Sequence, residues 1–142
     1  MNFVYRAASP FVFVGFTLLN QTAFGADITD DMRLMARVYA TLEARNQKAY
    51  CSAMHGVAYV DYLNKVCQSA VQNKVKKSDE CSQERIAQEV KADTGKCLAM
   101  PPAEFEKTAL RGDEGSKGFV KKMAEQGVDG KKLLQDERAK LK

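Results

Sequence analysis

The stretch Ser52–Gln72, SAMHGVAYVDYLNKVCQSAVQ, is the longest part of the chain after residue 25 that is both apolar and periodic like a helix. Placed at 100° per residue, its apolar side chains fall on one broad arc. The opposite arc is narrow and carries Asp61 and Lys65, an i,i+4 pair of opposite charge, with His55 and Tyr62. The pattern predicts a core helix that other elements cover on most sides. The broad arc consists of Ala53, Val57, Val60, Leu63, Cys67, Ala70 and Val71.

Residues 1–25 have the composition of a secretory signal peptide. A short region with one charge, Arg6, precedes the apolar run 11–19, and Ala23-Phe24-Gly25 places small residues at positions −3 and −1 of a cleavage site. The apolar run is about half of the ~20 residues that a membrane-spanning helix needs. The first residue after the cleavage site is Ala26 and not the cysteine that a lipoprotein needs there, so a lipoprotein is not expected. We expect an exported, periplasmic protein that begins near Ala26 and is not stably inserted in a membrane.

The remaining residues, 26–142, form a single domain by length. Without Arg6, 21 of the 22 basic residues stand against 18 acidic ones, a net charge near +3. The densest basic run, 74–77, is followed by Ser78 and then by Asp79 and Glu80. The chain therefore lacks the basic stripe of a nucleic-acid-binding protein, and we predict no nucleic-acid partner.

No strand alternation appears, so the predicted class is all-α, a bundle of about five to six helices with a disulfide-stapled hairpin. Thr29 or Asp30 caps a first helix that packs on the core helix. Ser52 caps the core helix, which leaves Tyr50 and Cys51 in the connection. The stripe of the first helix consists of Met32, Leu34, Met35, Val38, Tyr39 and Leu42.

The C-terminal half predicts shorter helices. A third helix begins at Ser78 and ends at Gly95, where a left-handed residue belongs. A short helix over residues 103–111 stops at Gly112, and the three glycines of the segment Gly112–Gly118 predict a flexible loop. A further short helix ends at Gly127, and a last one is capped by Asp129.

Four cysteines, at positions 51, 67, 81 and 97, are separated by 15, 13 and 15 residues. In an antiparallel helical hairpin, facing residues have a constant sum of positions. Cys51 with Cys97 and Cys67 with Cys81 both sum to 148. Among the three connectivities of four cysteines we favour these nested disulfides, with Cys51–Cys67 and Cys81–Cys97 as the alternative.

One geometric objection applies to the nested pairs. Positions 16 apart in a straight α-helix differ by about 160°, so Cys51 and Cys67 would not both face the partner helix. The predicted helix ends answer this in part, because Cys51 precedes the Ser52 cap and Cys97 follows the end of the third helix. Cys81 remains off the apolar face of the third helix.

The sequence offers few groups for catalysis. After residue 25 it has one histidine, His55, and lacks Gly-x-Ser-x-Gly, a phosphate loop and His-Glu-x-x-His. The helical neighbours of His55 at i±3 and i±4 include no carboxylate that could orient it as a base. Cys51-x-x-x-His55 supplies two of the four ligands that zinc needs, and Cys-x-x-Cys is absent. We predict no enzyme, no metal site and no cofactor.

In size, export signal, helicity and cysteines over the whole mature chain, this sequence resembles the periplasmic immunity proteins that protect bacteria from peptidoglycan amidases delivered by type VI secretion. The resemblance implies a helical homodimer whose loops plug the Cys/His cleft of a cognate hydrolase. It assigns no site residue position by position, because no sequence motif carries it.

The predicted function is a periplasmic protein that inhibits a cell-wall hydrolase by occluding its active-site cleft. A holdase-type chaperone with an adaptable methionine-rich surface, or a structural component of an envelope complex, are the alternatives. Two segments are candidates for entering a cleft. They are the hairpin tip, with Lys76, Ser78 and Asp79, and the Gly112–Gly118 loop, with Asp113, Glu114 and Ser116. We favour the loop because it can protrude without disturbing the stapled helices, and the helix faces bearing His55 and Tyr62 come next.

Overall fold

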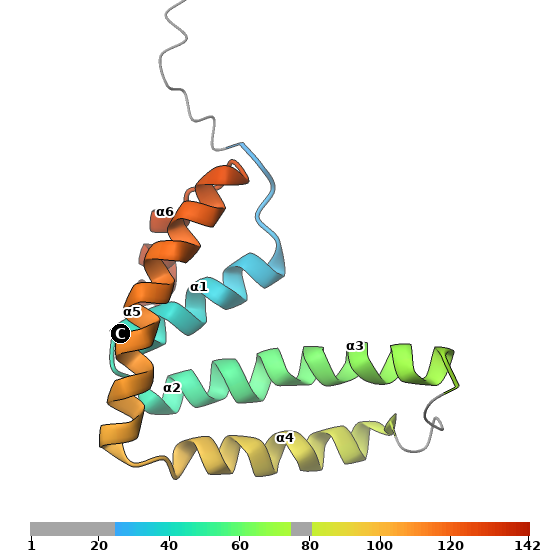
Figure 1. The fold of residues 1–142 in the computed structure, drawn as a ribbon. Helices are drawn as coiled ribbons and strands as arrows, with labels where there is room; N and C mark the ends of the chain where they lie inside the picture. Colours follow the sequence, from blue (N-terminus) through green and yellow to red (C-terminus); the bar gives the residue numbers. More distant parts are fainter. Residues whose placement is uncertain (1–24, 75–80) are drawn as a thin grey trace, which may run out of the picture.

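A computed structural model describes residues 25–74 and 81–142 of the chain. No strand occurs among these residues, so the all-α class is confirmed. α2, η1 and α3 follow one another as one long helix (Figure 1). The elements are α1 (Asp30–Glu43), α2 (Gln47–Cys51), the π-helix η1 (Ser52–Ala58), α3 (Tyr59–Gln72), α4 (Gln83–Leu98), α5 (Pro102–Glu125) and α6 (Gly130–Ala139).

We define the body as α1, α5 and α6. α1 packs on both α5 and α6 rather than mainly on the predicted core helix. The predicted stripe of α1 is right for the buried Val38 and Leu42 and wrong for Met35, which is exposed. The ring of Tyr39 packs on that of Phe119, with centroids 5.5 Å apart. The body core consists of Ala36, Phe119, Met123, Val128, Leu133 and Leu134.

The segment Gly112–Gly118 is not the predicted loop but part of α5, a continuous helix of 24 residues. Two of its glycines allow close packing instead of flexibility. A Cβ on Gly112 would lie 2.5 Å from Leu42 Cδ1, and one on Gly115 would lie 2.8 Å from Tyr39 Cε1. The missing side chains let α5 approach α1. The short helices predicted on either side of this segment are therefore one helix.

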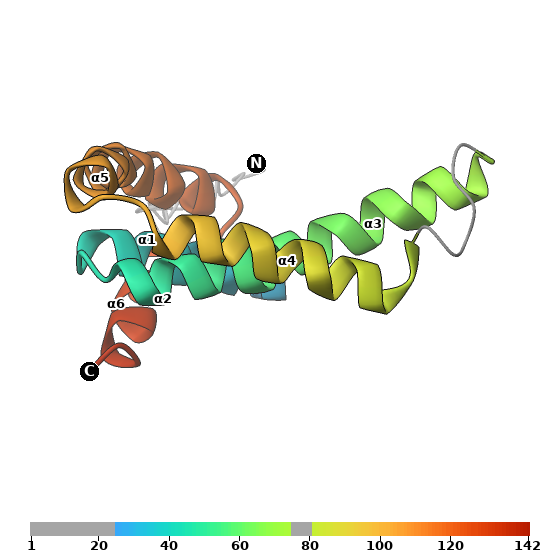
Figure 2. The ribbon, with the colours of Figure 1, turned by 90° about the horizontal axis from the view of Figure 1, so that it is seen from below.

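We call the antiparallel hairpin of η1, α3 and α4 the arm. It extends away from the body, and α4 packs along η1 and α3 (Figures 1 and 2). The prediction that Ser52–Gln72 is a core helix is wrong, because Ala53 and Cys67 are its only buried residues. The periodicity of a stretch shows how much apolar surface it offers. The periodicity does not show how many neighbouring helices cover that surface. Over most of its length this helix has one neighbouring helix, α4.

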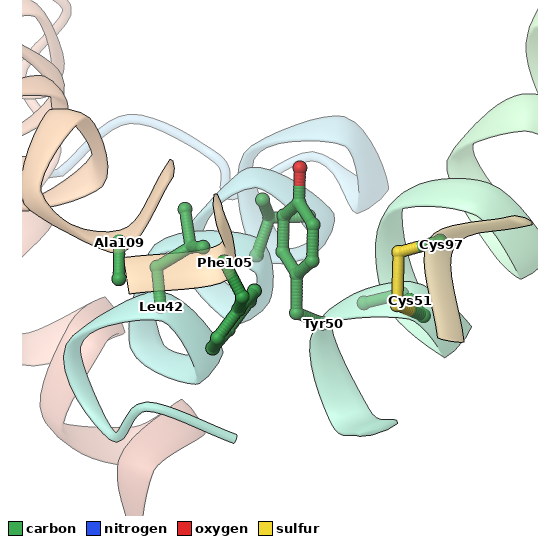
Figure 3. Close-up of a cluster of buried hydrophobic side chains, with 8 residues drawn as sticks. Leu42, Tyr50, Cys51, Cys97, Phe105 and Ala109 are labelled. Atoms are coloured by element: carbon green, nitrogen blue, oxygen red, sulfur yellow. A yellow bond between two sulfur atoms is a disulfide. The ribbon is translucent and has the colours of Figure 1, made fainter. Parts of the chain in front are cut away.

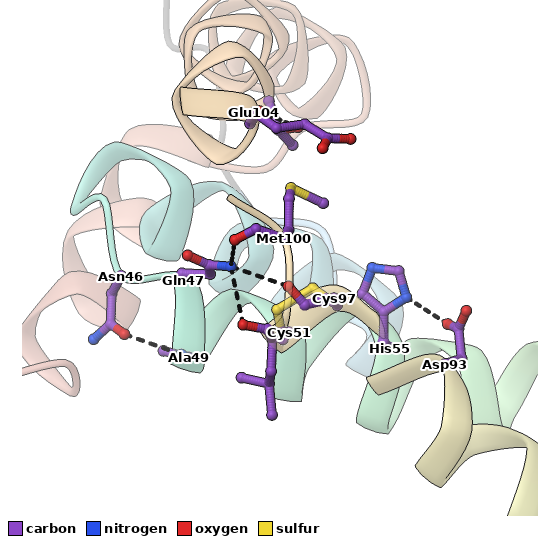
Figure 4. Close-up of a disulfide and its surroundings, with 11 residues drawn as sticks. Asn46, Gln47, Ala49, Cys51, His55, Asp93, Cys97, Met100 and Glu104 are labelled. Atoms are coloured by element: carbon purple, nitrogen blue, oxygen red, sulfur yellow. Dashed lines mark hydrogen bonds and ion pairs between the residues drawn. A yellow bond between two sulfur atoms is a disulfide. The ribbon is translucent and has the colours of Figure 1, made fainter. Parts of the chain in front are cut away.

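A second hydrophobic cluster joins the arm to the body (Figure 3). The rings of Tyr50 and Phe105 pack there with centroids 5.7 Å apart, and burial raises the pKa of Tyr50. The side-chain amide of Gln47 donates to the carbonyl oxygens of Cys97 at 3.0 Å and Met100 at 2.9 Å, which satisfies the C-terminal end of α4 (Figure 4). We call this the hinge cluster, which comprises Val38, Leu42, Tyr50, Cys51, Ala53, Cys97, Phe105 and Ala109.

Three predicted helix boundaries are confirmed. The Thr29 side chain accepts from the Met32 amide at the start of α1. Asp129 caps α6 in the same way by accepting from the Lys132 amide. Gly127 has a φ of 72° just after α5, the left-handed conformation that glycine favours.

Two other predicted boundaries are wrong. Ser52 is not a cap but lies inside the long helix, whose cap is Asn46, with its side chain accepting from the Ala49 amide at 3.0 Å. Gly95 lies inside α4, which runs on because Gln47 satisfies the carbonyls beyond it. The predicted start at Ser78 lies outside the described residues, within which α4 follows the cap Ser82.

A buried carboxylate, Glu137, holds α6 to α1. It is 2% exposed and accepts from Arg37 Nε at 3.1 Å and from Lys140 Nζ at 2.5 Å. Burial by itself would raise its pKa, but the two cations more than offset burial. The pKa of Glu137 therefore lies below its ordinary value of 4.5.

We expect Glu137→Gln to lower the free energy of unfolding at pH 7 by about 1.5 kcal/mol, the lower end for bonds to charged groups, because both cations are half-exposed. Because the folded pKa is depressed, the carboxylate's stabilisation is complete above pH 4.5 and is lost as the pH falls through the folded pKa. Urea unfolding at pH 7 and from pH 5 to 3 measures both effects. Glu125→Gln, the same change at an exposed carboxylate of α5, is the control. Equal acid sensitivity of wild type and Glu137→Gln would contradict this assignment.

Candidate functional site

Disulfides fasten the arm at both ends. Cys51–Cys97 lies at its root and Cys67–Cys81 near its tip, each with Cα atoms 5.6 Å apart. The nested connectivity is confirmed, and no cysteine is free. Disulfides form and persist in oxidising compartments, so these two indicate such a compartment for this protein.

Two polar pairs lie between the disulfides. His55 Nδ1 is 2.5 Å from Asp93 Oδ2 (Figure 4), and the Tyr59 hydroxyl donates to Glu89 Oε1 at 2.8 Å. Both pairs again have positions that sum to 148. The constant-sum rule, first applied to the cysteines, thus holds at four places along the arm.

The π-helix η1 explains how Cys51 and Cys67 come to face the same neighbour. A π-helical turn holds about 4.4 residues instead of 3.6, so each residue advances by about 82° instead of 100°. Over the seven residues of η1, the direction of the side chains therefore turns by roughly 120° less than it would in an α-helix. This removes most of the 160° difference in direction between Cys51 and Cys67. The explanation from helix ends is wrong for Cys51 and Cys97, which both lie inside helices. It holds for Cys81, which precedes the cap of α4.

His55 has a carboxylate partner, contrary to the sequence-based expectation. Asp93 comes from α4, not from the helix of His55, and so it is absent from the i±3 and i±4 positions. Applying the constant sum to position 55 would have found it. A His–Asp pair can act as a base with its orienting group. Among the described residues, however, no hydrogen bond joins His55 to a hydroxyl or thiol, and its ring instead meets that of Tyr50 edge-on at 5.9 Å.

An exposed apolar strip runs along the arm. Tyr62 is 58% exposed, and Met54 and Val66 are each 40% exposed. Tyr59, Tyr62 and Val66 recur at i, i+3 and i+7 and so share one helix face, and Met54 lies about one π-helical turn before Tyr59. We name Met54, Tyr59, Tyr62 and Val66 the arm strip.

Two contacts orient Tyr59 within the strip. The rings of Tyr59 and Tyr62 stack with centroids 6.2 Å apart, and the hydrogen bond to Glu89 raises the pKa of Tyr59 and fixes its ring. Tyr and Met are enriched where proteins bind one another. Exposure and composition together make the strip the best candidate for a contact surface in the described part of the chain.

The three predicted contact residues of α5 have different surroundings. Asp113 accepts two bonds from the Arg45 guanidinium, at 2.9 and 2.8 Å, which lowers the pKa of Asp113. Ser116 is buried and donates to the Asp113 carbonyl at 3.0 Å. Glu114 is exposed and pairs with Lys117. Asp113 and Ser116 are thus engaged within the fold, and a partner contact through them stays a prediction.

The other predicted contact residues, Lys76, Ser78 and Asp79, lie outside the described residues. Within residues 25–74 and 81–142, no three His, Cys, Asp or Glu side chains gather as metal ligands would. The helices of these same residues are all too short or too polar to cross a membrane. Comparison with protein families, with curated proteins and with solved structures finds no match to this chain.

Proposed function

We propose that this protein is an exported inhibitor that binds a cell-wall hydrolase and occludes its active-site cleft with the arm strip. The observation that carries the proposal is the exposed apolar strip on a projecting hairpin with a disulfide at each end. Ordering a loose segment on binding costs affinity, and the arm is ordered before binding. A narrow projection of two helices can also enter a concave target such as a cleft, which a flat protein surface cannot do.

Export is part of the proposal. The two disulfides support an oxidising compartment, and residues 1–25 have the pattern of a signal peptide. Cell-wall hydrolases act in that compartment, and a cell that meets one there needs an inhibitor in the same place.

The arm strip has the chemistry of a binding hot spot. Tyr62 offers a large apolar ring with a polar end at a low cost in conformational entropy, and Val66 extends the apolar surface one turn further. Glu89 and Asp93 lie beside the strip on α4 and are already hydrogen-bonded within the arm. A partner is therefore expected to insert an apolar side chain against Tyr62 and Val66.

Exposed methionines favour a second candidate, a holdase-type chaperone. Met35 and Met54 are each 40% exposed, and methionine adapts to varied apolar partners. A holdase would bind many clients weakly, whereas an inhibitor would bind one partner tightly. A structural component would bind other proteins of the envelope. In a homodimer, the strip would contact a second copy.

We expect the double variant Tyr62→Ala/Val66→Ser to weaken partner binding at least tenfold, about 1.4 kcal/mol, because it removes the exposed apolar centre of the strip. Leu110→Ala, which shortens an equally exposed side chain on the body, is the matched control. Pull-down from periplasmic extract identifies the partner. Calorimetric titration and an assay of peptidoglycan hydrolysis then measure affinity and inhibition, and circular dichroism checks helicity.

Several outcomes would argue against the proposal. Unchanged affinity of the double variant would exclude the arm strip as the contact surface. Recovery of many weakly bound proteins in the pull-down, in place of one stoichiometric partner, would favour the chaperone. A wild-type dimer that the double variant converts to a monomer would assign the strip to self-association. A neighbouring reading frame for a small exported hydrolase would supply the first partner to test.

A further inference from the structure

Ala26 and Ile28 lie beside the turn that joins α5 to α6. The Ala26 amide donates to the Gly127 carbonyl at 3.4 Å, a long hydrogen bond. Ala26 also lines a cavity of about 270 Å³ at the same place. Its polar wall consists of Asp129, Lys132 and Asp136, and its apolar wall of Ile28, Val128 and Leu133.

The Gly25–Ala26 peptide bond has the features that a signal peptidase requires. Gly25 and Ala26 are exposed and belong to no helix or strand, and Ala23 and Gly25 are the small residues of the cleavage pattern. Hydrolysis adds the hydroxyl of water to the Gly25 carbonyl carbon and breaks the carbon–nitrogen bond. Ala26 then leaves as an amine, which takes up a proton at neutral pH.

We propose that cleavage before Ala26 creates an α-ammonium group and that the cavity at the α5–α6 turn is a binding site for it. The site would hold this primary ammonium through the Gly127 carbonyl and the carboxylates of Asp129 and Asp136. The inference rests on the proposed export of the protein.

Three physical arguments support this site. An ammonium has three donors and no planar amide geometry, so it can shorten a bond that is 3.4 Å long for the amide. Gly127 follows the C-terminal end of α5, where the dipole of a 24-residue helix favours a positive charge. The cavity is also lined by two carboxylates, those of Asp129 and Asp136, and by only one ammonium, that of Lys132. Lys132 Nζ lies 3.8 Å from Asp136 Oδ2.

The bound group would fasten the start of the domain. Thr29, which caps α1, follows three residues after Ala26. Carboxylates and helix carbonyls raise the pKa of an amine above its ordinary value of about 8. The resulting stabilisation is complete below that value and is lost as the pH rises through the folded pKa. Asp129, Lys132 and Asp136 are the charged residues that line the cavity together with Ala26.

The test uses protein recovered from the periplasm, with its first residue read by mass spectrometry. We expect Ala26 as the first residue, an amine pKa above 8 by NMR titration, and loss of that shift in Asp129→Asn/Asp136→Asn. Asparagine preserves the cap of α6, which isolates the effect of charge. One glycine added before Ala26 should lower the melting temperature by about 2–5 °C at pH 7 and have no effect above about pH 10.

Asp31→Asn, an exposed acid at the start of α1, is the control and should leave the amine pKa unchanged. A chain that begins at Ala26 with an amine pKa of about 8 would overturn the ammonium site and leave the proposed export intact. A different first residue would overturn the site as well, and an uncleaved chain would overturn both proposals.

Discussion

Removing the Cys51–Cys97 disulfide by replacing both cysteines with alanine is expected to lower the free energy of unfolding by about 4 kcal/mol. The bond closes a loop with a sequence separation of 46. Closing a loop of this length lowers the conformational entropy of the unfolded chain, which corresponds to about 4 kcal/mol of stability. Both sulfur atoms lie in the hinge cluster, so alanine adds no buried polar group there. Urea unfolding of the wild type and the double variant measures the difference.

The second disulfide is the matched control for this experiment. Cys67–Cys81 has a separation of 14, which corresponds to about 3 kcal/mol. It also lies near the tip, where few other described side chains are buried, so its loss should spare the body. A larger loss from removing Cys67–Cys81 than from removing Cys51–Cys97 would show that the arm, and not the hinge cluster, limits stability.

Phe105→Ala is expected to cost about 3–5 kcal/mol, the range for emptying a buried aromatic site. Phe105 is 5% exposed and comes from α5, while its ring neighbour Tyr50 comes from the long helix that leads into the arm. The substitution removes one of the contacts that join the body to the arm and leaves a cavity in the hinge cluster. Thermal and urea unfolding measure the loss.

Hydrogen exchange identifies where the effect of Phe105→Ala falls. The amides of η1 and α4, which depend on the hinge cluster, should exchange faster, whereas those of α6 should change less. Leu110→Ala, five positions further along α5 at an exposed site, should change stability by less than about 0.5 kcal/mol. Equal losses for the two variants would contradict the assignment of Phe105 to the connection between body and arm.

Both predictions bear on the proposed function. The arm strip can act as a preordered contact surface only while the arm keeps its position on the body, so both variants should also weaken partner binding. The Glu137→Gln variant changes the α1–α6 contact instead, and partner binding should tolerate that change.

The sequence predicted those features that depend on local chemistry. Four cysteine positions with a constant sum predicted both disulfides, because the geometry of an antiparallel hairpin is simple. Residue type predicted Asp129 as a cap, and Thr29 as one of two possible caps with Asp30, because such side chains can accept a hydrogen bond from an amide three residues ahead, as Thr29 and Asp129 do. The all-α class follows in the same way from periodicity within each segment.

The tertiary structure decided which surfaces meet, and there sequence-based prediction failed. Gly112 and Gly115 were interpreted as a loop, and only the approach of α1 shows that they remove side chains from a helix contact. Asp93 reaches His55 across the hairpin, and the π-helix that aligns such pairs has no signature in the order of residues. The apolar face of Ser52–Gln72 was expected to be covered. Val57, which belongs to that face, is 48% exposed, because a two-helix arm has one neighbour for each helix, and the number of neighbours is a property of the assembled fold, not of the sequence of one segment.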